Sequence, residues 1–176
     1  MGTEVGSEAD GVGTLVPREF GPWYEGCHDR VLAGVRVATG DADNARDAVS
    51  EAFTRAFERW DRVSVMQRPE AWVYTVAVNW LRRRWRRAAI ERRLWEREAT
   101  HDRRPSDPLP DPELWAAVAS LASRQRQALA LRYVLGLTQQ EVAQEMGVNE
   151  GTAASTLSKA RAALARWLGA QEETTA

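Results

Sequence analysis

The sequence predicts an all-α fold, built as two small helical domains joined by a Pro-rich linker. Three observations predict it: apolar residues recur at three- and four-residue spacing, no segment alternates with the period of a strand, and four of the seven prolines fall between positions 105 and 112. We place a disordered tail at 1–16, the first domain at 17–98, the linker at 99–112, the second domain at 113–170 and a second tail at 171–176.

Length and composition exclude several classes of protein. The 176 residues, 44% of them hydrophobic, are enough to build a core, which excludes wholesale disorder. The longest uncharged stretch, 71–81, has 11 residues, whereas a membrane span needs roughly 20. The acidic, Gly-rich start does not read as a secretory signal, and a lone Cys27 cannot form an internal disulfide. We therefore expect a cytoplasmic protein without membrane insertion.

Charge is segregated along the chain although the formal net charge is only −1. Residues 1–61 hold 6 basic and 12 acidic groups, 62–104 hold 12 and 5, and 105–176 hold 6 and 8, which gives −6, +7 and −2. Ten Arg lie between Arg82 and Arg104 against four acidic residues. This density favours phosphate contacts with nucleic acid, and a solvated helix face is the alternative.

A first helix is predicted from about Pro22 to Gly40, because Pro suits the first turn and Gly the stop. Its apolar stripe consists of Phe20, Trp23, Tyr24, Cys27, Val31, Val35 and Ala38. Since Cys27 lies on this stripe, we expect a buried, inert thiol rather than a reactive or metal-binding one.

A second helix is predicted from about Asp43 to Trp60, with an outer stripe that is mostly acidic: Asp47, Glu51, Arg55 and Glu58. The residues alone allow a solvated face with i,i+4 pairs such as Glu51 with Arg55, or a face that docks on a protein. The segment Asp61 to Arg68 lacks helical period and is predicted to be a loop.

A third helix is predicted to start at Pro69, with one apolar half and a polar arc of Thr75, Asn79, Arg82 and Arg86. The Arg run that follows is interleaved with Trp85 and Trp95. Such aromatic residues offer stacking surfaces for single-stranded nucleic acid, although Trp85 could equally belong to the core.

The second domain is predicted to contain four helices. The first includes Leu114 and Val118, the second is capped by Ser123 and ends at Gly136, and the last is capped by Asn149 and reaches about Leu168. Between them, Thr138 and Glu141 form a capping box, and Gly147 closes that helix. Ala143 lies where the two helices would cross, and they would share an apolar core of Val142, Met146, Val148, Ala153 and Leu157. This pattern indicates a DNA-binding helix-turn-helix, and an ordinary helical hairpin is the alternative.

No pattern of residues indicates catalysis, a metal or a cofactor. The only histidines, His28 and His101, are far apart, and adjacent Cys27 and His28 point about 100° apart on a helix. The chain contains no CxxC or HExxH spacing and no phosphate-binding glycine loop. We therefore expect a protein that is not an enzyme.

The order of these segments resembles a known family. A helix ending in "ATGDADNARDAVSEAFTRAFERW" is followed by "RPEAWVYTVAVNWLRRRWRR", a Pro-rich linker and "SRQRQALALRYVLGLTQQEVAQEMGVNEGTAASTLSKARAAL". Over residues 18–168 this arrangement resembles the bacterial extracytoplasmic-function (ECF) sigma factors, which are dissociable initiation subunits of RNA polymerase. The resemblance implies three partners: core RNA polymerase, promoter DNA and an anti-sigma factor.

The resemblance also implies roles for individual residues. The second helix would bind the polymerase clamp through Asp47, Glu51, Arg55 and Glu58, which favours docking for the acidic stripe. The loop at 62–68 would receive a base flipped out of the duplex, and the third helix would follow the melted strand. The implied minus-ten contacts are Arg62, Ser64, Met66, Thr75, Asn79, Arg82, Arg83 and Arg86. The last helix would read the minus-35 element in the major groove through Asn149, Thr152, Ser155, Thr156 and Lys159.

Two stretches depart from the family pattern. Members commonly read "GTVKSRLxRAR" where this chain has "GTAASTLSKAR", so Ala154 replaces a usual Lys and Thr156 a usual Arg. Loss of two phosphate contacts should weaken duplex binding and flatten its salt dependence. "DAVSEAF" stands where "DLVQEAF" is usual, so that Ala48 and Ser50 are expected to weaken packing.

The main hypothesis is a sigma factor that directs promoter recognition and DNA opening for transcription initiation. Two alternatives remain open at this point. One is a stand-alone helix-turn-helix transcriptional regulator whose first domain dimerises or senses a signal. The other is a degenerate sigma-like protein that binds polymerase or a regulator without reading the minus-35 element, for which the altered recognition helix is the main support.

Overall fold

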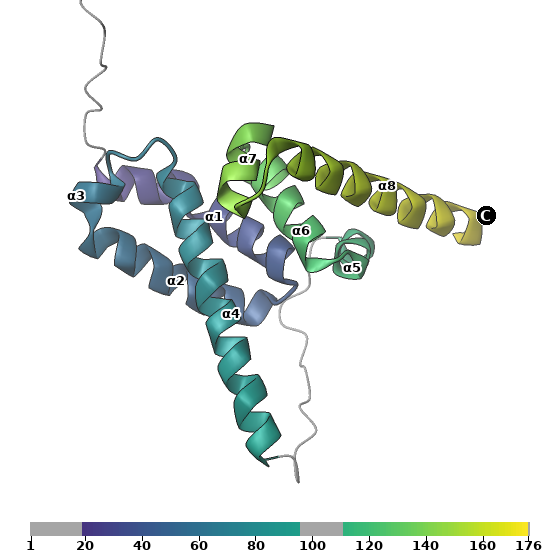
Figure 1. Ribbon diagram of the computed structural model, residues 1–176, viewed down its shortest axis with the longest axis horizontal. Helices are drawn as coiled ribbons and strands as arrows, with labels where there is room; N and C mark the ends of the chain where they lie inside the picture. Colours follow the sequence, from purple (N-terminus) through teal and green to yellow (C-terminus); the bar gives the residue numbers. More distant parts are fainter. Residues whose placement is uncertain (1–18, 96–110, 176) are drawn as a thin grey trace, which may run out of the picture.

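The computed structural model describes residues 19–95 and 111–175 (Figure 1). Within these two ranges all regular structure is helical, which confirms the predicted fold class. The tail predicted at 1–16 and most of the linker predicted at 99–112 lie outside the described residues. None of the described helices combines the length and the apolar composition that crossing a bilayer requires.

The first domain consists of α1 (Phe20–Thr39), α2 (Ala42–Glu58), the short α3 (Trp60–Val63) and α4 (Pro69–Trp95). Gly40 ends α1 in the left-handed conformation, with φ of 69°. Asp41 then begins α2, because its side chain accepts a hydrogen bond from the N–H of Asn44 at 3.1 Å. The predicted loop at 61–68 is wrong at its start, since residues up to Val63 form α3.

The core of the first domain lies where α1, α2 and α4 meet. Small and branched side chains fill it, so that the helices approach closely; its fully buried members include Val31, Val35, Ala45, Val49, Ala52, Val73, Tyr74, Ala77 and Leu81. Ala48 is also fully buried in this core. At the far end of α1, aromatic rings form a cluster with centroids 4.7 to 5.9 Å apart that contains Phe20, Trp23, Tyr24, Phe53, Phe57 and Trp60.

The second domain consists of α5 (Pro112–Ser120), α6 (Ser123–Leu129), a π-helical turn η1 (Ala130–Val134), α7 (Gln139–Met146) and α8 (Glu150–Thr175). The prediction that Ser123 caps α6 is wrong by one residue. Ala122 holds the cap position, and its N–H donates to the side-chain oxygen of Gln125 at 3.1 Å. The last helix continues to Thr175, so neither its predicted end at Leu168 nor a separate tail from 171 is observed.

The helix-turn-helix is formed by α7 and α8, with the caps that the sequence predicts. Thr138 and Glu141 make both bonds of the capping box, at 3.2 and 2.7 Å. Gly147 ends α7 with φ of 63°, and the Asn149 side chain accepts from the N–H of Thr152 at 2.8 Å to begin α8. Val142, Ala153 and Leu157 are buried between the two helices.

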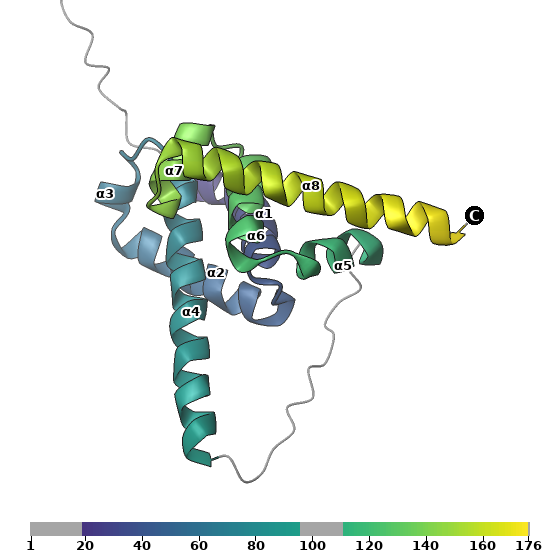
Figure 2. The same ribbon diagram turned by 45° about the vertical axis from the view of Figure 1, so that its right-hand side comes forward.

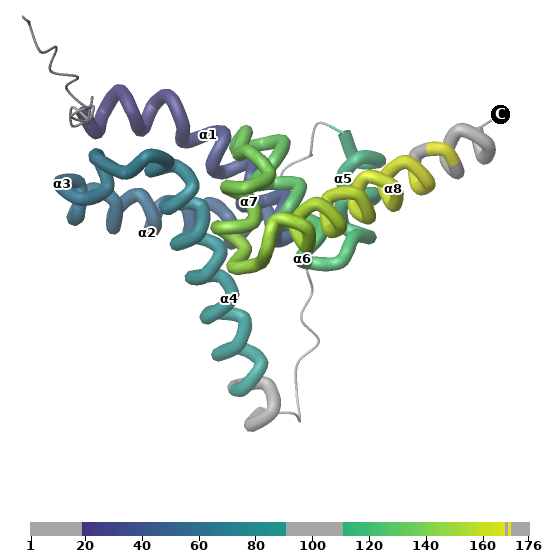
Figure 3. The backbone as a smooth tube through the Cα atoms, turned by 45° about the horizontal axis from the view of Figure 1, so that its top comes forward, coloured from purple at the N-terminus to yellow at the C-terminus, as the bar shows by residue number. Residues whose placement is uncertain are grey.

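The two domains pack against each other. In Figures 1 and 2, α6 and α7 lie against α1 and the beginning of α4, whereas the far halves of α4 and α8 project in different directions. Figure 3 shows the same arrangement from above, with α7 beside the upper part of α4. Except for Ala117 and Val118 of α5, the buried apolar residues of both domains form one continuous cluster.

Candidate nucleic-acid interface

The outer face of α2 carries the four residues that the sequence assigned to polymerase binding. Asp47 and Glu58 are exposed, and Glu51 and Arg55 are half-buried. The Arg55 guanidinium donates to Glu51 Oε1 from Nε at 3.0 Å, and its Nη2 lies 2.8 Å from the same oxygen. The i,i+4 pair expected for a solvated face is therefore present on a face that is also open to a partner.

An apolar hollow beside this face was missed by sequence reasoning. Phe57 is 64% exposed, and its ring lies 5.0 Å from that of Phe20. The hollow measures about 470 Å³ and is lined by Phe20, Tyr24, His28, Ser50, Phe53, Thr54 and Phe57. The available signal was an aromatic residue one position outside the inward stripe of α2. Aromatic side chains are enriched on surfaces that bind other proteins, which makes this hollow a candidate docking site.

The segment between α3 and α4 brings together some of the predicted minus-ten residues. Arg62 is exposed on α3, and Met66 is half-buried against the core. Ser64 is only 1% exposed, and its hydroxyl donates to the carbonyl oxygen of Asp61 at 3.5 Å. In this arrangement its side chain faces the protein rather than an incoming base.

The polar arc of α4 is exposed along most of its length. Asn79, Arg82, Arg83 and Arg86 are exposed, whereas Ala77, Val78 and Leu81 on the other side of the same turns are buried. A rigid helix thus holds a row of cations away from the core, where phosphates can reach them. Thr75 differs from the rest of the arc, because it is half-buried and donates to Glu145 Oε2 at 2.9 Å.

The two described Trp residues nearest this arc belong to the protein's own packing. Trp85 is half-buried, and its indole N–H donates to Asp41 Oδ2 at 3.3 Å, which ties α4 to the start of α2. Trp80 is covered by the Arg84 guanidinium, 5.4 Å from the ring centroid. Of the two earlier interpretations of Trp85, the structure favours the core. Trp95 ends α4.

The recognition helix α8 presents an open polar face. Thr152, Ser155 and Lys159 are exposed there, and Thr156 is half-buried with its hydroxyl donating to the Thr152 carbonyl oxygen at 2.8 Å. Asn149 is exposed but its side-chain oxygen is used as the helix cap. Ala154 lies half-buried at the edge of this face. Lys159 is thus the only cation among the residues predicted to contact the minus-35 element.

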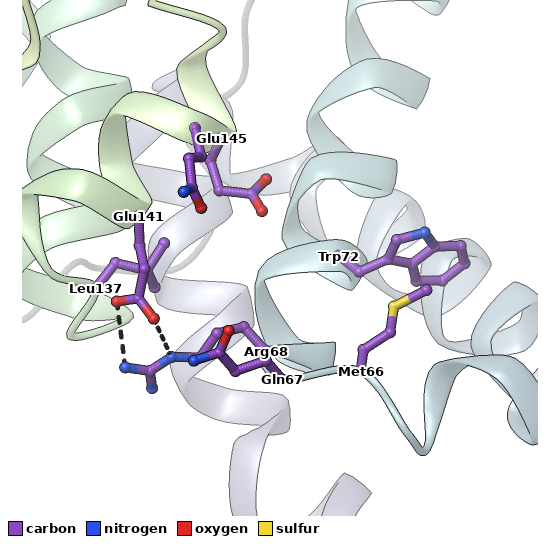
Figure 4. Close-up of a pocket in the computed structure, with 8 residues that line it drawn as sticks. Met66, Gln67, Arg68, Trp72, Leu137, Glu141 and Glu145 are labelled. Carbon is purple, nitrogen blue, oxygen red and sulfur yellow. Dashed lines mark hydrogen bonds and ion pairs between the residues drawn. The ribbon is translucent and has the colours of Figure 1, made fainter. Parts of the chain in front are cut away.

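A charged cluster joins the two domains beside the predicted minus-ten loop. Arg68 donates from Nε to Glu141 Oε1 at 2.8 Å and from Nη2 to Oε2 at 3.3 Å, as Figure 4 shows, and its Nη1 lies 3.7 Å from Glu70. The hydrogen bond from Arg68 and the one from the Thr138 N–H lower the pKa of Glu141 to about 2. The same pair raises the pKa of Arg68 above its usual value. Both groups therefore stay charged at neutral pH.

Cys27 is the one cysteine of the chain and lies in the core of the first domain. Cys27 is 3% exposed, and burial, followed by the charge of Glu70, raises the pKa of its thiol to about 11. The prediction of a buried thiol is confirmed. Among the described residues no group of three or more His, Cys, Asp or Glu side chains is arranged to hold a metal ion.

Family models match both domains in order. The model described as Sigma-70 region 2 matches residues 23–90, and the model described as Sigma-70, region 4 matches residues 112–164. The first match covers the core, the predicted loop and the arc of α4. The second covers the helix-turn-helix.

Curated proteins of the same kind are similar along most of the chain. The RNA polymerase sigma-E factor of Streptomyces coelicolor is 26% identical over 162 residues, which cover 88% of each chain. The ECF RNA polymerase sigma factor SigL of Mycobacterium tuberculosis is 30% identical over 135 residues, which cover 72% of this chain and 75% of SigL.

Solved structures show the same fold. The sigma factor RpoE, in complex with the anti-sigma factor NepR from Bartonella quintana, superimposes with a TM-score of 0.71 at 21% identity, covering 85% of this chain and 96% of RpoE. CnrH, in complex with the cytosolic domain of CnrY, gives 0.58 at 21% identity, covering 86% and 88%. The chain matches both sigma family models in order, is 30% identical to SigL over 72% of its length and has this two-domain helical fold. It therefore belongs to the ECF family of RNA polymerase sigma factors.

Proposed function

We propose that this sigma factor divides promoter recognition among three surfaces, with the arc of α4 as the part that reads the minus-ten element. The observation that carries the proposal is the exposed row of Asn79, Arg82, Arg83 and Arg86 on a helix whose opposite side is buried. A melted strand needs a positively charged, rigid track, because phosphate contacts offset the few kcal/mol that unstacking costs. Arg62 and Met66 flank the start of this track and would meet the flipped base.

Core polymerase would dock on the outer face of α2. Asp47, Glu51, Arg55 and Glu58 supply a mostly acidic surface, and the exposed Phe57 supplies an apolar contact next to it. Exposed aromatic rings that become buried on binding commonly carry a large share of the binding energy. We therefore expect Phe57 to matter more for docking than any single carboxylate.

The N-terminal half of α8 would enter the major groove of the minus-35 element. Thr152, Ser155 and Lys159 are exposed and can reach base edges or phosphates, while Asn149 and Thr156 lie at the ends of this surface. With Ala154 and Thr156 in place of cations, few contacts with phosphate remain. This surface would therefore act mainly when polymerase delivers it to DNA.

Cellular context follows from the same proposal. The protein would work in the cytoplasm, where polymerase and promoter DNA are found. RpoE and CnrH are seen in complexes with NepR and with the cytosolic domain of CnrY, and NepR is an anti-sigma factor. We expect an anti-sigma factor to hold this chain inactive as well.

Run-off transcription with core polymerase tests the assignment of the α4 arc. Promoter templates are used both as duplex and with the minus-ten region already opened. The variant carrying Asn79→Ala and Arg82→Ala should lose transcription while retaining core binding in a pull-down. Arg84→Ala serves as the control, because Arg84 is an exposed cation of the same helix that lies outside the arc. Unchanged transcription by the double variant would remove these residues from the proposed site.

A further inference from the structure

The apolar hollow beside α2 is a groove between the first half of α1 and the second half of α2. Its α1 side consists of Phe20, Tyr24 and His28, and its α2 side of Ser50, Phe53, Thr54 and Phe57. The rings of Phe20 and Phe57, 5.0 Å apart, mark one end of the groove. The ring of His28, 5.6 Å from that of Phe53, marks the other end. We call this groove the Phe57 hollow.

The size of the Phe57 hollow suits a short segment of chain. Phe57 is 64% exposed, the largest exposed fraction among the large hydrophobic side chains of the described residues. A contact that covers its ring is favourable, because it removes apolar surface from water. Seven residues line the hollow, whereas a stable interface between two folded proteins takes about 20 to 30 residues on each side. A peptide segment therefore fits the hollow better than a second folded copy does.

The segment nearest to the hollow in the chain is the one that leads into α1. Glu19 directly precedes Phe20 and has extended backbone, with φ of −73° and ψ of 135°. Before it, residues 11–18 read GVGTLVPR and lie outside the described residues. This stretch contains the apolar residues Leu15, Val16 and Pro17 within five positions of Phe20. Proline also disfavours helical backbone at the residue before it, which is Val16.

The length of this segment matches the length of the hollow. From Phe20 to His28 the groove follows eight residues of α1, which is about 12 Å at 1.5 Å per residue. Extended chain covers about 3.3 Å per residue, so about four residues span the same distance. Residues 13–17 are sufficient, and Arg18 with Glu19 remains for the turn back along α1. On an extended segment Leu15 and Pro17 share one side, and Thr14 faces the other.

Charge favours the same occupant. Residues 11–18 contain one basic residue, Arg18, and no acidic residue. Exposed carboxylates stand beside the hollow on both helices: Asp29 Oδ1 lies 2.9 Å from Nδ1 of His28, and Glu58 directly follows Phe57. A segment with one positive charge is therefore attracted to the hollow, although solvent weakens the attraction between exposed charges.

We propose that residues 13–17 bind in the Phe57 hollow of the same chain, with Leu15 and Pro17 against its aromatic rings and Arg18 beside Glu58. The bound segment covers Phe57, the ring through which core polymerase is proposed above to dock on α2. The consequence for polymerase rests on that proposed function. Polymerase and the segment compete for one aromatic ring, so each chain must release the segment before α2 can dock.

Tethering makes a weak contact sufficient. A segment joined to its site through a few residues acts at an effective concentration of roughly 1 mM. A contact with a Kd of about 0.1 mM therefore covers the hollow in about nine chains of ten. A docking site that is free in only a tenth of the molecules has an apparent affinity about tenfold weaker than the uncovered site. The segment thus sets how much polymerase is needed for half-maximal binding.

Fluorine NMR on the full chain tests whether the segment covers the hollow. The chain contains three Phe residues, and all three line the hollow, so 4-fluorophenylalanine places every fluorine label there. The resonance of Phe57 is the one that Phe57→Leu removes. A soluble gadolinium chelate broadens the resonances that solvent reaches. The wild type should protect the Phe57 resonance, and Leu15→Asp should expose it. Equal broadening in the two proteins would overturn the proposal.

Thr14→Asp is the matched control, because it adds the same charge one position away and on the other side of an extended segment. It should leave the Phe57 resonance protected. If both variants expose Phe57 alike, the added charge rather than the loss of Leu15 is responsible, and the proposed placement is refuted. Protection that disappears on dilution of the wild type would assign the segment to a second copy and would equally refute the contact within one chain.

Binding to immobilised core polymerase, measured by biolayer interferometry, tests the competition. Leu15→Asp should bind core about tenfold more tightly than the wild type, because its hollow is always free. Thr14→Asp should bind like the wild type. If Leu15→Asp exposes the fluorine at Phe57 and still binds core with unchanged affinity, the competition is refuted.

Phe57→Ser separates the proposal from the function on which it rests. The fluorine experiment is read without polymerase and does not depend on where polymerase docks. If the wild type protects Phe57 while Phe57→Ser binds core normally, the docking assignment fails and the contact of the segment with the hollow stands. If the wild type leaves Phe57 unprotected while Phe57→Ser loses core binding, the docking assignment stands and the proposed contact fails.

Discussion

Restoring two cations to the recognition helix is expected to change how duplex binding depends on salt. The perturbation is Ala154→Lys with Thr156→Arg, at half-buried positions on either side of the exposed face of α8. Each new phosphate contact adds about 0.9 to the slope of log K against log salt, so two add about 1.8. When salt rises from 50 to 200 mM, the variant should therefore lose roughly twelve times more affinity than the wild type loses. The variant should also bind duplex DNA more tightly than the wild type at low salt.

Fluorescence anisotropy with a labelled duplex, titrated at four or more salt concentrations, measures that slope for the full chain. A control with the same net charge carries Ala116→Lys and Ala119→Arg, which are exposed on α5 rather than α8. The control should change the slope by less than half of the expected amount. If the two double variants have equal slopes, the residues at 154 and 156 do not contact DNA phosphates, and the placement of α8 in the groove is refuted.

Three further outcomes are expected from single groups. Tyr74→Phe should raise the free energy of unfolding in urea by about 1 kcal/mol, because the buried Tyr74 hydroxyl has no hydrogen-bond partner among the described residues. Cys27 should react with Ellman's reagent slowly in the native protein and rapidly in urea, since burial raises the pKa of its thiol to about 11. Arg68, which also faces Glu70, lowers the pKa of Glu141 to about 2. The ionised Glu141 carboxylate should therefore contribute its full stabilisation above pH 4.5, and this contribution should be lost as the pH falls toward 2. Glu141→Gln should remove that part of the acid transition.

Each of these expectations can fail in a specific way. A fall in stability for Tyr74→Phe would mean that the hydroxyl is hydrogen-bonded in solution. Fast native labelling would place Cys27 at the surface. Identical acid transitions for the wild type and Glu141→Gln would show that the carboxylate has its ordinary pKa in the folded protein.

Elements whose signals are local could be predicted well. The capping box at Thr138, the cap at Asn149 and the stop glycines at 40 and 147 all appear in the structure where the sequence placed them. In each case the residue that forms the bond lies within four positions of its partner. A pattern in a short window is sufficient to identify such contacts.

Some errors had equally local causes. Serine favours the cap position, which predicts a cap at Ser123. In the structure, however, the Gln125 side chain accepts from the N–H of Ala122, and Ala122 holds the cap position. Residues 60–63 form α3 although the segment is too short to show a helical period. Ser64 is among the minus-ten contacts that the resemblance implies, whereas the structure buries it directly after α3.

The contact between domains could not be predicted, because no local pattern encodes it. Arg68 and Glu141 are 73 positions apart, and each has an ordinary local role, one in a loop and one in a capping box. Gly34 likewise reads as an unremarkable helix residue in the sequence. Only the fold shows that a Cβ atom at this position would lie 3.6 Å from Leu135 Cγ. The polar arc of α4 was thus visible in the sequence, but the contact of its Thr75 with Glu145 of α7 was not.

The apolar contact between the two domains, where Gly34 meets Leu135 and Tyr74, has a consequence for temperature. Contacts such as that of Leu135 with Gly34 are driven by removal of apolar surface from water, and this driving force weakens on cooling. The separation of the domains should therefore carry a positive heat capacity change. Chilling would increase the fraction of free chains in which the two domains have separated. Salt, which screens only charged pairs such as Arg68 with Glu141, would change that fraction little.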